Sequence, residues 1–148
     1  MEETRQIIKY LDREALKLIN LWQIQSEINS KLGGLILNPN SLDYLLEIVK
    51  EDDIYPTLEE KAALYCFKIV TNHPFVDGNK RTGMGAILWF IELNNAYFRR
   101  FSDDKVLEIT VSIAEKRLSF EDLVDLIRAR ILFRRRPRLR YLRNKLPH

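Results

Sequence analysis

The sequence is poor in the features that could hold a fold together by covalent or metal links. It has a single cysteine, Cys66, which excludes a disulfide framework and a cysteine-based zinc site. Five glycines and five prolines among 148 residues exclude collagen-like and low-complexity chains. The length and the 46% hydrophobic content instead suit one domain that buries a core of its own.

Long apolar segments are also missing. An apolar run such as Ala86 to Ile91 is far too short to cross a bilayer. Residues 1–5 are largely charged and lack the apolar stretch of a signal peptide. We therefore expect a cytoplasmic protein that makes no membrane contact.

The charge is unevenly distributed along the chain. Nine lysines and arginines and no acidic residues lie between Arg128 and the last residue, whereas residues 1–127 hold 15 basic and 21 acidic residues. We therefore separate a domain over 1–133 from a basic tail over 134–148. Such a tail can bind nucleic acid, or it can be a solvated end that pairs with an acidic partner. Since few aromatic residues interrupt it, we favour the second reading and expect nucleic-acid binding, if any, only through this tail.

The first half of the domain has the periodicity of helices. Residues 11–32 carry apolar side chains at three- and four-residue steps, which predicts one amphipathic helix. Asp12 can cap its start, and the Gly-Gly pair that follows ends it, because glycine tolerates the left-handed conformation. A turn is expected over 38–40, and Ser41 is expected to cap the next helix, 41–49.

The clearest helix start in the sequence is Thr57. Glu60 follows three residues later, which is the spacing of a capping box, and Pro74 disfavours helix at the residue before it. This signal predicts a helix over 57–72. Further helices are expected over residues 80–94, 104–117 and 120–133. With no convincing strand alternation in the chain, we predict a compact all-α fold of about six helices.

The loop between the two central helices contains groups suited to binding a phosphate. Gly78 and Asn79 can fold so that backbone N–H groups converge, and the following helix adds the positive end of its dipole. Lys80 and Arg81 place two cations where acidic residues are normally preferred. That local mismatch is expected where an anion binds.

Two further residues of this loop supply chemistry. Asp77 offers a carboxylate beside the phosphate groups, as Mg²⁺ commonly requires. His73 can accept a proton from an attacking hydroxyl at neutral pH, and Phe75 is expected to anchor the loop by pointing inward. Each residue alone has an ordinary explanation as a helix cap, a turn or a solvated surface. Together they are the parts that phosphoryl or nucleotidyl transfer needs.

Residues 73–81, HPFVDGNKR, resemble the signature of the Fic/Doc family, His-x-Phe-x-(Asp/Glu/Asn)-(Gly/Ala)-Asn-(Gly/Lys)-Arg, at every fixed position. The resemblance extends over about 11–131 and implies an all-helical fold with the active loop between two central helices. It implies that His73 is the base and that Asp77 holds Mg²⁺. It further implies that Asn79, Lys80 and Arg81, with Gly78, hold the phosphates of ATP.

Lys80 decides the subgroup that the resemblance implies. Members that transfer AMP have glycine there, whereas Doc-type (death-on-curing) toxins have lysine and present the γ-phosphate of ATP to the target. AMP-transferring members also carry a second arginine where this chain has Met84. Gly83 and Gly85 leave the start of the helix thin, either for the approach of phosphates or a target or for packing against another helix.

Partners are implied in the same way. Doc-type toxins phosphorylate a threonine of translation elongation factor Tu and are inhibited by an antitoxin that folds over the site. No glutamate here is followed by glycine or asparagine, so the chain lacks the self-inhibiting motif of other members. Residues 50–56 take the place of the family's target-docking flap, in which Ile54 and Tyr55 could contact the target or simply form a surface connection.

Three hypotheses follow. The first is a bacterial Doc-like kinase toxin that uses ATP and Mg²⁺ to phosphorylate a serine or threonine of a translation factor, so inhibiting translation. The second is AMP transfer (AMPylation) to a protein hydroxyl. The third, from a different class, is an inactive binding module whose basic tail binds nucleic acid or a partner.

Overall fold

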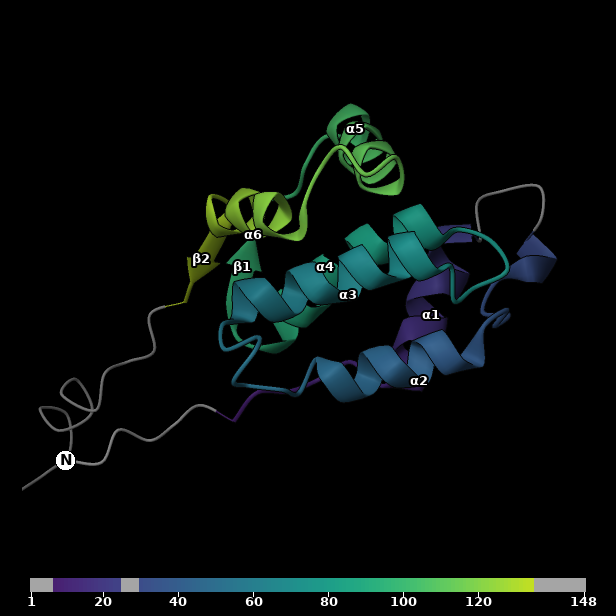
Figure 1. Ribbon diagram of the computed structural model, residues 1–148, viewed down its shortest axis with the longest axis horizontal. Coiled ribbons are helices and arrows are strands. Elements are labelled where there is room, and N and C mark those ends of the chain that lie inside the picture. The colour runs from purple at the N-terminus through teal and green to yellow at the C-terminus, as the bar shows by residue number, and fades with distance from the viewer. Residues whose placement is uncertain (1–6, 25–29, 135–148) are drawn as a thin grey trace, which may run out of the picture.

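The computed structural model describes residues 7–24 and 30–134, and within these it is built almost entirely from helices (Figure 1). The elements in chain order are α1 (Arg13–Ile24), a 3₁₀ helix η1 (Ser30–Leu32), α2 (Pro39–Ile48), α3 (Leu58–Asn72), α4 (Asn79–Leu93), β1 (Ala96–Phe98), α5 (Asp103–Ala114), α6 (Phe120–Arg128) and β2 (Ile131–Phe133).

Helices α3 and α4 form the centre of the fold. They pack against each other along their lengths, with α1 against α4, α2 against α3, and α5 and α6 over the opposite side (Figure 1). Burial of apolar surface from all these helices drives the assembly. The largest fully buried apolar side chains are Tyr65, Phe75, Phe90, Leu16, Ile19, Ile24, Leu42, Leu45, Leu64, Ile69 and Ile87. The prediction of a compact, mostly helical fold is confirmed.

Most of the predicted helix starts are found. Asp12 accepts a hydrogen bond from the backbone N–H of Ala15 at 2.9 Å, and Thr57 accepts one from the N–H of Glu60 at 3.2 Å. Ser119 forms a reciprocal capping box with the third residue of α6. These side chains satisfy N–H groups that a helix leaves unpaired in its first turn.

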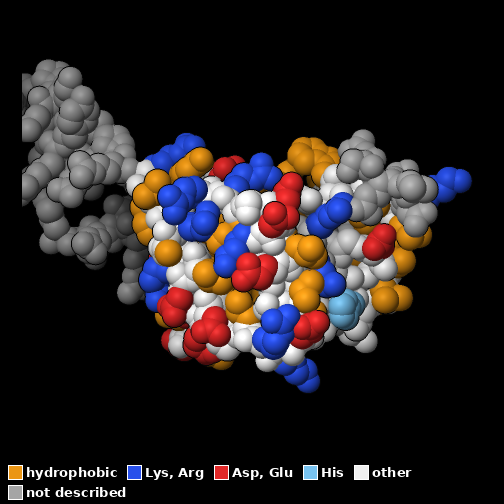
Figure 2. Space-filling model, turned by 90° about the horizontal axis from the view of Figure 1, so that it is seen from above, with side chains coloured by type: hydrophobic (Ala, Val, Ile, Leu, Met, Phe, Trp, Pro, Cys, Tyr) orange, Lys and Arg blue, Asp and Glu red, His pale blue; other side chains and the backbone are white. Residues whose placement is uncertain are grey.

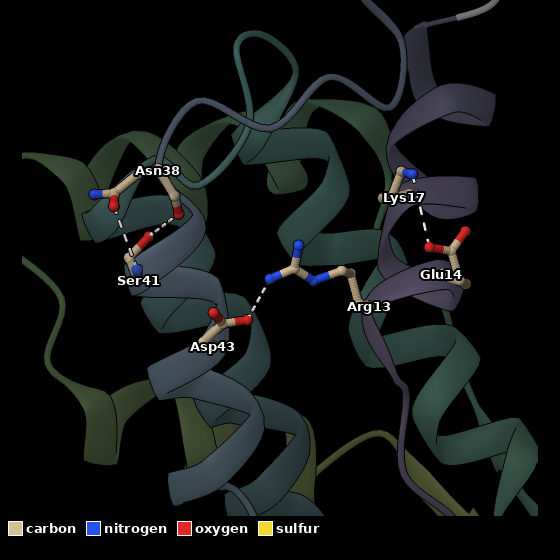
Figure 3. A network of polar contacts seen from close by, with 6 residues as sticks. All are labelled: Arg13, Glu14, Lys17, Asn38, Ser41 and Asp43. Carbon is tan, nitrogen blue, oxygen red and sulfur yellow. Dashed lines mark hydrogen bonds and ion pairs between the residues drawn. The ribbon is translucent and has the colours of Figure 1, made fainter.

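The start of α2 differs from the prediction. Asn38, not Ser41, is the N-cap, and the helix begins directly at Pro39 (Figure 3). Proline suits the first helical position because its missing N–H would have no partner there. Asn38 accepts from the N–H of Ser41, and Ser41 donates its hydroxyl back to the Asn38 carbonyl at 3.0 Å. The predicted turn over 38–40 is therefore the first turn of the helix.

The ends of three predicted helices also differ, and one of these is α5, which ends at Ala114 rather than at residue 117. Helix α1 is described as far as Ile24, residues 25–29 lie outside the described part, and the chain then continues as a 3₁₀ turn. The last helix ends at Arg128, where the sequence predicted helix as far as Phe133. Of the basic tail, the structure describes only Arg134.

Two short strands were not predicted. Strand β1 pairs antiparallel with β2, with Tyr97 opposite Leu132. Three residues are too few to show the two-residue alternation by which a strand is found in a sequence. The ribbon is stabilised by pairing between segments more than thirty residues apart. No helix of the described residues is long and apolar enough to cross a membrane.

Candidate active site

The candidate site begins where α3 ends. His73 takes the left-handed conformation (φ 48°) as the C-cap of α3, and its N–H donates to the Ile69 carbonyl at 3.2 Å. Histidine is among the few residues other than glycine that adopt this conformation with some frequency. Its side chain is exposed, and the face drawn in Figure 2 has a histidine at the surface with basic and acidic side chains nearby. The imidazole is therefore accessible to a protein substrate.

Gly78 sets the start of α4. It has φ 75° and lies so close to α1 that a Cβ atom would be 2.8 Å from Ile24 Cγ1. Both the backbone conformation and the lack of space therefore require glycine here. The chain turns at this point directly into the first turn of α4.

Asn79 closes the loop with its side chain. Its Oδ1 accepts from the N–H of Phe75 at 3.0 Å, and its Nδ2 donates to the Phe75 carbonyl at 2.9 Å. Phe75 itself is fully buried in the core. The resemblance implied that Asn79 helps to hold phosphates. Its side-chain amide joins the two ends of the loop, so its backbone N–H is the group left for a phosphate.

A segment remote in sequence lies against the loop. Ile36 and Phe75 form an antiparallel bridge, and the Val76 N–H donates to the Leu35 carbonyl at 3.0 Å. The Pro74 carbonyl accepts from the N–H groups of the residues over 37–38. One short extended segment, 35–38, therefore borders the loop, although no alternation of apolar and polar residues predicts a strand there.

Asn20 is the residue that the sequence analysis missed. Its side chain is fully buried, and its Nδ2 donates to the Asp77 carbonyl at 2.7 Å and to Thr82 Oγ1 at 2.9 Å. Its Oδ1 accepts from the Gly34 N–H at 2.8 Å. One amide thus connects α1, the start of the 35–38 segment, the loop and α4. A signal existed, because Asn20 lies four residues from two buried apolar residues on the same face of α1.

The remaining polar groups define what the site can bind. The Gly78 N–H donates to Asp77 Oδ1 at 2.8 Å, so the second carboxylate oxygen remains for a ligand. The N–H groups of Asn79 and Lys80, in the first turn of α4, have no acceptor among the residues described. Of the expected cluster of loop amides, those of Phe75, Val76 and Gly78 are bonded within the protein, so the Asp77 N–H and this helix end are what the described residues leave for a ligand.

A groove of about 810 Å³ extends from Lys80 and Arg81 between α1, α4 and α5. Its aromatic wall includes Trp22 and Trp89, whose rings meet edge to face with centroids 5.0 Å apart. Trp22 is more than half exposed. An apolar wall thus continues directly from the basic start of α4.

The two glycines inside α4 serve packing. A Cβ on Gly83 would lie 3.1 Å from the Cys66 carbonyl on α3, and one on Gly85 would lie 2.9 Å from Ile19 on α1. Of the two readings of these glycines, the structure therefore favours close contact between helices. Met84 is buried, with its sulfur 3.8 Å from that of Cys66, and complete burial raises the pKa of the Cys66 thiol to about 12.

Ile54 and Tyr55 are not part of this site. They precede α3, whereas the loop follows it, and Figure 1 shows the two connections at opposite ends of α3. A helix of 15 residues is about 22 Å long. Tyr55 packs edge-on against Phe120, with ring centroids 5.7 Å apart, while Ile54 is exposed. The segment that borders the loop is 35–38, whereas residues 50–56, predicted as the flap, lie at the other end of α3.

Comparison with known proteins identifies the family of the chain. The model of the Fic/DOC family matches residues 4–91, which include the loop and most of α4. This span is more than half of the chain, and the chain belongs to the Fic/DOC family. It is also similar to a protein of Mycolicibacterium smegmatis (strain ATCC 700084 / mc(2)155) named Toxin Doc, with 28% identity over 113 residues. The match spans 73% of this chain and 82% of that relative, so the predicted resemblance to Doc toxins is confirmed.

Proposed function

We propose that the protein is a Doc-like toxin that transfers the γ-phosphate of ATP to a serine or threonine hydroxyl of a protein. The observation that carries this proposal is the shared location of three groups. The exposed His73 imidazole, one oxygen of Asp77 and the open N–H groups of α4 border the same loop. Translation elongation factor Tu is the target that the resemblance implies, and its modification would inhibit translation.

His73 is the proposed base. The target hydroxyl oxygen attacks the γ-phosphorus, the bond from that phosphorus to the β,γ-bridging oxygen breaks, and ADP leaves. The proton of the hydroxyl passes to an imidazole nitrogen of His73. Because the left-handed conformation of His73 is fixed by the end of α3, its ring starts from a defined backbone position.

The donor groups around Asp77 fit Mg²⁺. Among the residues described, no three His, Cys, Asp or Glu side chains gather to hold a metal, so Asp77 would act with phosphate oxygens and water. The ion, when bound, neutralises charge on the phosphates. Lys80 and the N–H groups at the start of α4 would hold the same phosphates, with Arg81 beside them.

Lys80 and Met84 favour phosphate transfer over AMP transfer. Met84 is buried at the position where AMP-transferring members carry a second arginine. Lys80 is exposed at the start of α4, where a nucleotide lying against the helix would need the room that glycine gives. We therefore propose that ATP binds with its γ-phosphate toward the target.

The groove beside Lys80 supports an antitoxin partner. An exposed Trp22 and the adjoining apolar wall form a surface that a partner protein would bury. Such a partner would lie next to the start of α4 and so cover the loop. We propose inhibition in trans in this way.

The test is transfer of label from ATP. The protein is incubated with Mg²⁺, elongation factor Tu and ATP labelled at either the α- or the γ-phosphate. We expect γ-label on the target, whereas α-label would establish AMP transfer instead. Absence of both labels would favour the inactive binding module.

Two variants make the test specific. His73→Asn keeps a residue that tolerates the left-handed conformation but removes the base, and it should lower transfer at least about 100-fold. Tyr44→Phe, a change on the exposed side of α2, serves as the control with unchanged transfer. Full activity in His73→Asn, with unchanged thermal stability, would contradict the assignment of the base.

A further inference from the structure

The groove that begins at Lys80 is longer than the phosphate-binding loop requires. Helix α4 forms its floor, and α1 and α5, which both pack against α4, form its walls. From Lys80 to Trp89 the helix rises about 13 Å, away from the loop. The groove volume of about 810 Å³ lies in the range of roughly 300–1,000 Å³ that small-molecule sites occupy. The groove can therefore hold a ligand that extends well beyond the phosphates.

The walls of the groove suit a flat aromatic ligand. Both tryptophans of the chain line it, and Trp22 is 58% exposed although its ring meets that of Trp89 edge to face. Much of the Trp22 indole is therefore open to a ligand. Leu107, on the α5 wall, is 61% exposed in the same groove. An aromatic ring lying between the two walls would bury apolar surface on both of its faces.

The groove also contains a polar side chain without a partner among the described residues. Gln23 is half-buried in the α1 wall, and its amide forms no hydrogen bond there. It lies against α4 at Gly85, where a Cβ atom would be 3.0 Å from Gln23 Nε2. An amide offers a donor and an acceptor side by side, which match N7 and the N6 amino group of adenine. Guanine has acceptors at both positions, N7 and O6, and does not match.

We propose that this groove binds the adenosine part of ATP, with the base against Trp22 and its edge at Gln23. The inference rests on the proposed function, in which the γ-phosphate points toward the target at His73. The rest of the nucleotide must then extend away from the loop, and the groove extends in that direction from Lys80. A partner protein seated in the groove would exclude the nucleoside, so inhibition in trans would act by competition with ATP.

Intrinsic tryptophan fluorescence tests the proposal, because both tryptophans line the groove. ATP, GTP or inorganic triphosphate is added with Mg²⁺ to the full chain, without a target protein. We expect ATP to quench the fluorescence, whereas inorganic triphosphate, which has no base, should bind at the loop without this quenching. ATP should also bind about tenfold more tightly than GTP. Equal quenching by triphosphate, or equal affinity for GTP, would overturn the proposal.

Two substitutions separate the base from the phosphates. Trp22→Leu should weaken ATP binding in calorimetry about tenfold and leave triphosphate binding unchanged, while Trp22→Phe should retain ATP binding. Gln23→Leu should remove most of the preference for ATP over GTP. Tyr44→Leu removes an aromatic side chain of similar exposure from α2 and is the control with unchanged affinities. An unchanged affinity for ATP in Trp22→Leu would contradict the proposal.

The transfer assay distinguishes this proposal from the proposed function. Trp22→Leu should raise the KM for ATP with little change in kcat, because stacking of the base holds the ground state and the transition state alike. Binding of ATP that depends on Trp22, without any transfer, would support the adenosine site and contradict the proposed function. Transfer with an unchanged KM in Trp22→Leu would overturn the site and leave that function intact. Thermal unfolding of each variant verifies that the domain remains folded.

Discussion

The two connections that flank α3 are both polar, yet they are held in different ways. Before α3, the fully buried Lys61 donates its Nζ to the Val49 carbonyl and to Asp52, each at 2.8 Å. After α3, the loop is held by the neutral amides of Asn20 and Asn79. An amide both donates and accepts without adding charge. The charged groups of the loop can therefore bind a ligand. Before α3, in contrast, the charge of Lys61 is already engaged with Val49 and Asp52.

The largest effect on stability is expected from removing the side-chain amide of Asn20, which holds the loop after α3. Asn20→Ala leaves the Gly34 N–H, the Asp77 carbonyl and the Thr82 hydroxyl without their partner. Each buried group without a partner costs about 1–3 kcal/mol, so we expect a loss of about 3 kcal/mol in urea denaturation and loss of phosphate transfer. Asn40→Ala, which removes an exposed amide side chain from α2, is the control and should leave both properties unchanged. A variant that unfolds at the normal urea concentration would show that the amide does not hold the loop.

A pair of glycines sharpens the comparison. Gly78 and Gly34 have nearly the same positive φ, 75° and 77°. A Cβ on Gly78 would collide with Ile24, whereas one on Gly34 would meet only a carbonyl at 3.6 Å. We expect Gly78→Ala to cost about 2–3 kcal/mol of unfolding free energy, and Gly34→Ala about 1 kcal/mol from backbone strain alone. Equal costs would mean that the approach to α1 is not tight.

The opposite end of α3 should affect stability but not chemistry. Lys61→Met keeps the length of the side chain but leaves the Val49 carbonyl without its donor. We expect a loss of about 1–2 kcal/mol in the unfolding free energy. The rate of phosphate transfer by the folded variant should be unchanged, because residues 50–56 lie a helix length from the loop. A reduced rate in fully folded protein would indicate that the two ends are coupled.

The smallest effect on the free energy of unfolding is expected from titration of Cys66, in the middle of α3. Burial raises the pKa of the Cys66 thiol from 9.0 to about 12, so above pH 9 the unfolded chain releases a proton that the native state keeps. The free energy of unfolding is therefore unaffected at neutral pH and decreases as pH rises from 9 toward 12. The decrease is about 1 kcal/mol at pH 10. Urea midpoints at pH 7, 9 and 10 measure this loss.

Cys66→Ala provides the control for that pH series. It should show a smaller decline than the unchanged chain between pH 9 and 10. Burial also raises the pKa of Tyr65, which adds a decline of the same sign at higher pH. Identical pH profiles for the two chains would contradict the prediction.

The comparison of the two ends also explains which predictions succeeded. The helices followed from the spacing of apolar residues, and the caps at Asp12 and Thr57 followed from local hydrogen bonding within four residues. The predicted start of α2 was wrong because Asn38 and Ser41 are both residues that cap helices well. The proline between them favours the earlier cap, since proline suits the first helical position. Local signals therefore identified elements better than their ends.

The loop itself was found because its residues are contiguous in the sequence. Its supports were missed because Asn20 and the 35–38 segment lie about 40 to 60 residues away and have no special composition. Residues 50–56, predicted as the flap, directly precede α3 and the loop directly follows it, so the order along the chain already separates the two by a helix length.

The sequence by itself determined the helices, the contiguous signature of residues 73–81 and the family to which they belong, because these depend on periodicity and on neighbouring residues. Only the tertiary structure decided that Asn79 closes the loop, that Asn20 supports it and that Arg99 lies beside Arg130. Those outcomes depend on hydrogen bonds between segments distant along the chain. Such contacts form only when burial of the core brings the segments together.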